Sequence, residues 1–283
     1  MEKEVKLIKK VKHLIRKAGL PRWLHHYGPK TYEFLDHAVA LLMRAYCRLS
    51  FRRVKKLFNL LGMKCPTKSA LHYTTKNLSV KIWQYLLSIT ANCNIHIGAI
   101  DSTGFNKSSA SQYYLKRIHK NPHNKWTKLS AMFDTRRKKI ASAKVRIKPA
   151  HDTKDIKFLL KKKKPKILVA DKGYDSEKIH EFAYYHNILP MIAKKHWTKR
   201  GLFRRKHSKM FRERTYHRRE IAEALFFAIK RTLGSSINAK KAVMQRAEIY
   251  CRLICYNIFS FYFRDLGQSR LLLKLLKPCS NIY

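Results

Sequence analysis

Four residues in the last third of the chain follow the spacing Y-x2-R-x3-E-x6-K: Tyr216, Arg219, Glu223 and Lys230. Offsets of four and seven residues return to the same side of a helix, so we expect Arg219, Glu223 and Lys230 on one stripe. Tyr216 then lies at the edge of that stripe. A single carboxylate between cations and an aromatic ring suits a site that holds a metal ion together with a phosphodiester backbone.

Two upstream segments supply the carboxylates that such a site still lacks. Asp101 follows the apolar run Ile95-His-Ile-Gly-Ala-Ile100, and Asp171 follows Ile167-Leu-Val-Ala170. Short apolar runs of this kind are typical of central strands. Because open sheets bind ligands at strand ends, we expect both aspartates at the ends of strands and side by side. Taken alone, each could be a turn residue, and Glu223 could be a surface ion-pair partner of Arg219 or Lys230.

Three acids are enough for phosphodiester chemistry with two divalent ions. Two cations about 4 Å apart can stabilise both the attacking and the leaving oxygen of a displacement. Mg²⁺ keeps several waters and takes only one or two carboxylates per ion. We therefore predict that Asp101, Asp171 and Glu223 are catalytic and bind two Mg²⁺ or Mn²⁺ ions.

The charge of the chain indicates a polyanionic partner. Its 283 residues carry 63 Lys and Arg against 17 Asp and Glu, for a formal net charge of +46. Nucleic acid is the partner that such a charge favours, because binding to phosphates releases counterions. With 45% hydrophobic residues the chain is also globular. A basic binding protein without chemistry fits the composition equally well.

The first 92 residues read as helical and include a helix-turn-helix-like unit at about 50–77. Ser50 and Thr67 are expected N-caps of helices over about 51–61 and 67–76, with a glycine- and proline-containing turn between them. Arg52, Arg53 and Lys68 surround this unit, and we predict that they bind DNA. Plain structural packing of a helical hairpin is the alternative.

From residue 93 the pattern is that of an α/β domain. Strands are expected at 95–100, 126–134, 140–147, 167–170 and 188–193, and helices from His151, over 176–187, around Glu223 and over 239–263. This order predicts a mixed sheet with flanking helices. Residues 194–215 are expected to be a basic connector without apolar periodicity, and 266–283 a tail outside the domain at 93–265.

The three motifs in this order resemble those of DDE transposases of the insertion-sequence type, in the IS4/IS5 superfamily with its YREK signature. The resemblance covers roughly residues 30–265. It implies a ribonuclease H-like fold, with Asp101 on the first strand, Asp171 after the fourth, and Glu223 on a later helix. It also implies cleavage at the terminal inverted repeats of an element and transfer of the 3′-hydroxyl ends into target DNA. The short interval between Asp171 and Glu223 leaves no room for the large β-rich insertion of some members.

By the same resemblance Tyr216, Arg219 and Lys230 hold the DNA backbone near the metals. The partners are then double-stranded DNA, as inverted repeats and as target, and a second copy of the chain in a synaptic complex. Two alternatives stay open: a ribonuclease H-like nuclease or resolvase without strand transfer, and a DNA-binding protein without catalysis.

Single residues elsewhere in the chain carry smaller predictions. Asp152 is expected to cap its helix in preference to approaching the active site, and Asp134 to serve a hairpin turn. Trp126 is expected in the core, whereas Trp197 and the basic stretch 194–214 are expected to face DNA. The six cysteines fit a reduced compartment, and the thiols of Cys251 and Cys255 are expected to be buried. The start of the chain lacks a signal-peptide core and 243–263 carries charges, so we expect a cytoplasmic, nucleoid-associated protein without membrane contact.

Overall fold

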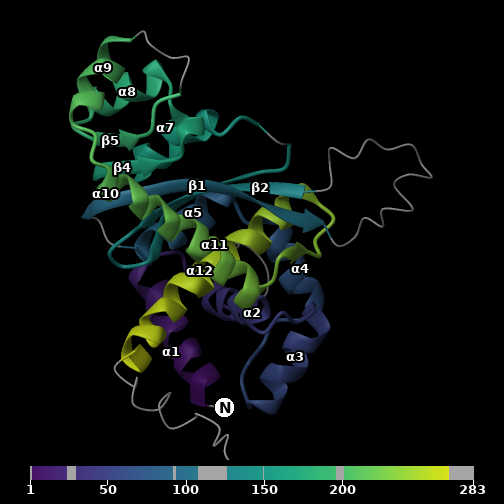
Figure 1. Cartoon of the computed structure of the whole chain (residues 1–283). Helices are drawn as coiled ribbons and strands as arrows, with labels where there is room; N and C mark the ends of the chain where they lie inside the picture. The colour runs from purple at the N-terminus through teal and green to yellow at the C-terminus, as the bar shows by residue number, and fades with distance from the viewer. Residues whose placement is uncertain are drawn as a thin grey trace, which may run out of the picture.

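A six-stranded mixed sheet forms the centre of the molecule (Figure 1). The computed structural model describes residues 2–23, 30–91, 94–107, 126–148, 150–195 and 201–267. The strands are β1 (Ile95–Lys107), β2 (Trp126–Asp134), β3 (Lys139–Arg146), β4 (Pro165–Ala170), β5 (Leu189–Ile192) and β6 (Ser236–Ile237). Their order is β3-β2-β1-β4-β5, with β6 paired to β1.

The direction of the strands confirms the predicted ribonuclease H-like sheet. The pairs β1–β2 and β2–β3 are antiparallel, whereas β4 runs parallel to β1 and β5 parallel to β4. A hairpin meander therefore continues into parallel strands, which need crossover helices. Those helices are α7 (Thr153–Lys162) between β3 and β4, and α8 (Glu177–Tyr185) between β4 and β5.

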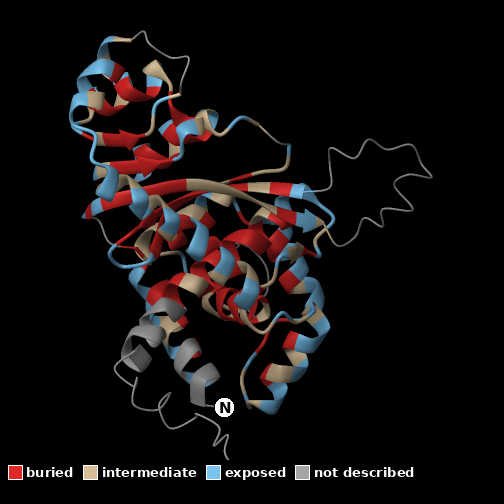
Figure 2. Cartoon of the chain, viewed as in Figure 1, coloured by how far each residue is buried: buried red, intermediate tan, exposed pale blue. Residues whose placement is uncertain are grey.

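Helices cover both faces of the sheet, and each face has its own core. Successive residues of a strand point to opposite faces, so Ala99 packs in one core and Ile100 in the other. The core on the side of Ile100 contains Leu159 of α7 and Ile179 of α8. Figure 2 shows the buried strands between the two helical layers.

The helices on the other side come from both ends of the chain. They are α1 (Glu2–Lys17), α2 (Phe34–Tyr46), α3 (Phe51–Leu60), α4 (Lys68–Asn77), α5 (Val80–Ile89), α11 (Glu220–Leu233) and α12 (Ala242–Gly267). The long helix α12 contacts α2, α5 and β3, so a single buried cluster joins the N-terminal helices to the sheet. The division at residue 92 stays a prediction from sequence, and the two parts share this core.

The predicted pair of N-terminal helices is present, with both predicted caps. The Ser50 hydroxyl accepts a hydrogen bond from Arg53 N at 3.3 Å, and the Thr67 hydroxyl accepts one from Ala70 N at 3.2 Å. Such bonds satisfy amides that have no partner within a helix. The helices α3 and α4 therefore begin where the sequence places them.

The basic stretch 194–215, expected to be a connector without apolar periodicity, also forms helices. Within the described residues this stretch contains α9 (Leu202–Lys209) and most of α10 (Glu213–Tyr216). Glu177 caps α9, because its carboxylate accepts from the backbone amides of Phe203 at 2.8 Å and Arg204 at 3.2 Å. The Arg204 side chain is buried and donates to Asp175 Oδ1 at 2.7 Å. At least one cation of this stretch therefore serves the fold; the prediction that the stretch faces DNA stays open.

Of the predictions for Asp134, Trp126 and Trp197, one is confirmed, one is wrong and one falls outside the described residues. The side chain of Asp134 accepts from the backbone of Arg136 and Arg137, which confirms its turn role. Trp126 is 50% exposed, so its placement in the core is wrong: it lies across Gly104, where an added Cβ would be 2.3 Å from the indole ring. Trp197 lies outside the described residues.

Two cysteines of α12, Cys251 and Cys255, lie in the core of the protein. Cys251 and Cys255 are both buried, which confirms the prediction, and burial raises the pKa of Cys251 to about 12. Among the helices of the described ranges, none combines the length and apolar character that a membrane crossing requires.

Candidate functional site

The register of the sheet brings Asp101 and Asp171 side by side. In the parallel pair β1–β4, Ile100 lies opposite Ala170, and the two aspartates come next on their strands. Asp171 follows the end of β4, as predicted. Asp101 lies in the middle of β1 and not at its end, because antiparallel pairing with β2 extends the strand to Lys107.

Asp101 lies in an acidic environment that is partly shielded from water. Its pKa is raised to about 6, first by burial and then by the negative charges of Glu223, Asp152 and Asp171. The Ser102 backbone N–H opposes this shift by donating to Asp101 Oδ1 at 2.7 Å. Three carboxylates from other parts of the chain therefore act on Asp101, and two of them are the other predicted acids.

Glu223 reaches this group from the first turn of α11, where it is paired with Arg219. The Arg219 guanidinium donates to Glu223 Oε1 at 2.7 Å, and the two side chains are 29% and 59% exposed. Arg219 belongs to the 3-10 turn η3 (His217–Arg219), which contacts both β1 and β4. The motif runs over α10, η3 and α11. Because the backbone stays right-handed helical at Tyr216 and Arg219, the predicted stripe is kept across these elements.

The aromatic and the second cation of the motif lie on either side of this pair. The Arg219 guanidinium lies 5.6 Å from the centre of the Tyr216 ring. Lys230, two turns along α11, donates to the Thr103 hydroxyl at 2.6 Å and lies 5.6 Å from the Phe105 ring. Both residues of β1 come just after Asp101. Burial lowers the pKa of Lys230.

The donors present are of the kind that Mg²⁺ and Mn²⁺ prefer. Carboxylate oxygens are hard ligands, and a cluster of mutually repelling acids gains stability when a cation binds among them. Within the part of the chain that the structure describes, no three acidic, histidine or cysteine side chains stand close enough together to bind one ion. Glu223 is paired with Arg219, so the structure does not bring its carboxylate together with the two aspartates around one ion.

Asp152 lies beside Asp101, although its place in the sequence favours a capping role. It occupies the N-cap position of α7 but makes no capping hydrogen bond, so the expected capping role is wrong. Its Oδ1 instead accepts from the Ser102 hydroxyl at 2.5 Å. The available signal was its place just after the third strand, because helix starts in open sheets lie at the same edge as the ends of parallel strands.

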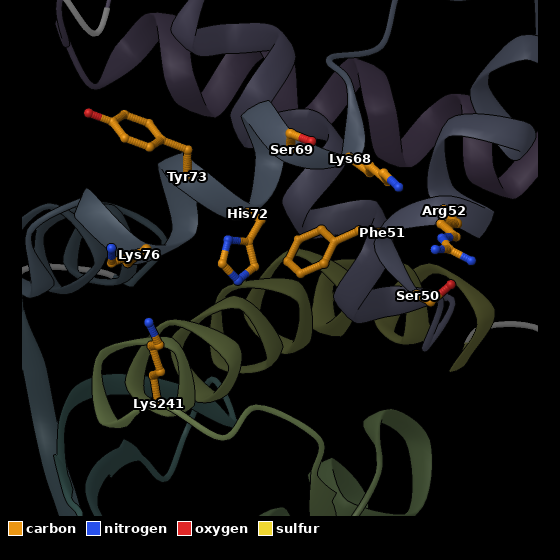
Figure 3. A pocket seen from close by; sticks show the side chains of 9 residues that line it. All are labelled: Ser50, Phe51, Arg52, Lys68, Ser69, His72, Tyr73, Lys76 and Lys241. Carbon is orange, nitrogen blue, oxygen red and sulfur yellow. The ribbon is translucent and has the colours of Figure 1, made fainter.

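Arg52, Arg53 and Lys68 lie well apart from the carboxylates in sequence, on the exposed surface of α3 and α4. A groove of about 590 Å³ lies there, and none of the described residues that line it is acidic. Figure 3 shows Phe51 and His72 together at its centre, with their ring centres 6.0 Å apart. The cations at its rim are Arg52, Lys68, Lys76 and Lys241.

A neighbouring groove of about 780 Å³ extends this surface toward the start of α12. It shares Ser50, Phe51, His72 and Lys241 with the first groove and adds Arg53. The exposed side of α4 carries Lys68, Ser69, His72, Tyr73 and Lys76, whose spacing places them on one face. This surface combines charge with polar and aromatic groups, as nucleic-acid interfaces do.

Comparison with known proteins gives a match over the α/β part of the chain. A family model described as the transposase DDE domain matches residues 93–258. Among solved structures, the chain is similar to the piggyBac transposase in its cryo-EM synaptic complex with hairpin DNA. The identity is 12%, the likeness covers 93% of this chain and 73% of that chain, and the TM-score is 0.49.

Proposed function

Because this chain belongs to the family with the transposase DDE domain, we propose that Asp101, Asp171 and Glu223 are its three catalytic acids. The chain is an enzyme of the DDE transposase type. The YREK spacing from Tyr216 to Lys230 supports a place in the IS4/IS5 superfamily. The observation that carries the assignment of the acids is the register of β1 and β4, which places Asp101 beside Asp171; the charge of Glu223 also acts on Asp101.

The three acids would hold two Mg²⁺ or Mn²⁺ ions. Such ions, when bound, stabilise the charge on the attacking and leaving oxygens of a phosphodiester. The carboxylates would fix the position of the ions, and the chain supplies them from β1, from the residue after β4 and from α11. Exposure of Glu223 supports this role, because an exposed ion pair with Arg219 is weak enough to exchange for a cation.

The reaction has two displacements at phosphorus. In the first, water attacks the phosphodiester at the end of the element, which leaves a 5′-phosphate and frees the 3′-hydroxyl. In the second, this hydroxyl attacks a phosphodiester of target DNA and expels another 3′-oxygen. Arg219, Tyr216 and Lys230 would hold the DNA backbone. The partial exposure of the Arg219 side chain, 29%, supports this contact.

The cationic surface on α3 and α4 is the proposed binding site for the terminal inverted repeats. Arg52, Arg53 and Lys68 would contact phosphates, and the exposed face of α4 would lie toward the bases. Since two ends must be joined in one event, we expect a dimer in the synaptic complex. Residues 93–265 would be the catalytic domain, and DNA binding would associate the protein with the nucleoid.

The test uses duplexes that carry the inverted repeats flanking the coding region. We expect Asp101→Asn, Asp171→Asn and Glu223→Gln each to abolish Mg²⁺-dependent cleavage while duplex binding, measured by fluorescence anisotropy, stays within about twofold of the wild type. Joining of labelled ends to a target plasmid separates a transposase from a nuclease. Full cleavage by any one variant would remove that residue from the catalytic set.

A further inference from the structure

A fourth acid lies beside the proposed catalytic carboxylates and is linked to one of them through a single residue. The Ser102 backbone N–H donates to Asp101 Oδ1 at 2.7 Å, and the Ser102 hydroxyl donates to Asp152 Oδ1 at 2.5 Å. One serine therefore connects the carboxylate on β1 to the carboxylate at the start of α7. Asp152 makes no capping bond to its own helix, so helix capping does not account for its place.

A lysine on the next strand keeps Asp152 ionised. Lys128 of β2, whose side chain is only 15% exposed, forms an ion pair with Asp152 Oδ1 and also donates to the Ala150 carbonyl. Although burial acts to raise it, the pKa of Asp152 is lowered by the hydrogen bonds from Lys128 and Ser102. An ammonium group at this oxygen repels a divalent ion, so Asp152 is poorly suited to bind metal there directly. Its contacts suit it to hold Ser102.

Tyr174 closes the other side of this group. It is 2% exposed, and its hydroxyl oxygen is buried close to Ser102 without the geometry of a hydrogen bond. The charges of Asp152 and Asp101 both act on this hydroxyl and add to the effect of burial in raising its pKa. The Ser102 side chain thus lies near Tyr174 as well as bonded to Asp152.

We propose that Asp152 is a positioning residue of the transposase: it fixes Ser102, and Ser102 in turn holds the Asp101 carboxylate in the orientation that binds a divalent cation. This inference rests on the proposed role of Asp101 as a metal-binding acid. Partners that orient a metal ligand commonly change metal affinity or activity by about 10- to 100-fold when they are removed. Ser102→Ala keeps the N–H that bonds Asp101 but removes the hydroxyl through which Asp152 fixes Ser102, so the loss of the hydroxyl, of Asp152 or of both should have the same effect.

The test measures Mn²⁺ binding by the full chain without DNA, from the electron paramagnetic resonance signal of free Mn²⁺. We expect Asp152→Asn, Ser102→Ala and the double variant each to weaken Mn²⁺ binding by about 10-fold. Glu181→Gln, which removes an exposed acid on α8, is the matched control and should bind as the wild type does. Thermal melting of each variant monitors folding, and Ser102→Ala keeps the test valid if Asp152→Asn unfolds.

The outcomes separate this inference from the proposed function. Wild-type Mn²⁺ affinity in both single variants overturns the positioning role. A double variant about 100-fold weaker than the wild type also overturns it, because additive losses mean that Asp152 acts independently of Ser102. Asp101→Asn is measured alongside: if it binds Mn²⁺ normally, the proposed metal-binding role of Asp101 fails first.

Discussion

Two arginine–glutamate pairs are each four residues apart in the sequence, and a Glu→Gln substitution should affect stability in one and cleavage in the other. Glu248 and Arg252 of α12 form a buried pair, with a distance of 2.6 Å and exposures of 5% and 7%. Arg219 and Glu223 form a pair of nearly the same length, 2.7 Å, at exposures of 29% and 59%. We predict that Glu248→Gln lowers stability strongly, whereas Glu223→Gln abolishes cleavage and changes stability little.

The expected loss of unfolding free energy depends on how deeply the arginine that loses its partner is buried. Removal of one partner from a buried ion pair costs about 3–5 kcal/mol of unfolding free energy, because the other charge stays buried. After Glu248→Gln, Arg252 still donates to the carbonyls of Gly234 and Ser236, so we expect the lower end, about 3 kcal/mol. An exposed pair contributes about 0–1 kcal/mol. Glu223→Gln also removes a negative charge that acts on Asp101, which offsets part of that loss.

Urea unfolding followed by circular dichroism measures both variants under the same conditions. Arg252→Met and the double variant Glu248→Gln with Arg252→Met complete a cycle, and the double variant should be more stable than the single glutamate variant because it removes the unpaired charge. A loss below about 1 kcal/mol for Glu248→Gln would show that the pair behaves as a surface pair. A loss near 3 kcal/mol for Glu223→Gln would contradict the view that Glu223 is held weakly enough to exchange partners.

Three further predictions concern other parts of the molecule. Gly104→Ala should lower stability by about 1–3 kcal/mol, because the new Cβ would overlap the Trp126 ring, and urea unfolding at the same pH measures this. Burial, followed by the charge of His180, lowers the pKa of His207; the unfolded chain therefore takes up protons first, and stability is lost as pH falls below about 6.5. The loss of unfolding free energy between pH 7.5 and 5.5 should then be smaller in His207→Gln than in the wild type. Lys68→Ala should weaken duplex binding at all sequences and reduce the slope of log K against log salt by about 1, while an unchanged slope would place Lys68 away from phosphates.

Local sequence was sufficient for the sheet and for the pairing of Asp101 with Asp171. A central parallel strand is apolar on both faces, so Ile95–Ile100 and Ile167–Ala170 could be recognised without knowledge of their neighbours. The extension of β1 beyond Asp101 could not be predicted, since Ser102 to Gly104 are polar or small. Pairing with β2 imposes the extended backbone there.

The elements that escaped prediction depend on partners distant in sequence. Residues 202–209 lack an apolar stripe because Arg204 and His207 occupy buried positions. Their burial is possible only because Asp175 and His180 lie opposite them, which no local pattern shows. Asp152 was assigned to capping for the same reason: its contact with Ser102 spans the whole β2–β3 hairpin.

The exposure of the proposed acids is consistent with a macromolecular substrate. Asp101 is half-buried on β1, whereas Asp171 is exposed and Glu223 is 59% exposed. A small-molecule site buries most of its ligand in a pocket, but a duplex can be approached only over an open surface. The rigid part of the site is thus the sheet, which sets the two aspartates by register, and the adjustable part is Glu223, which a weak ion pair holds nearby. DNA and cations together would supply the free energy that moves Glu223 from Arg219 to the aspartates, and the freed guanidinium would then be available to the phosphate backbone.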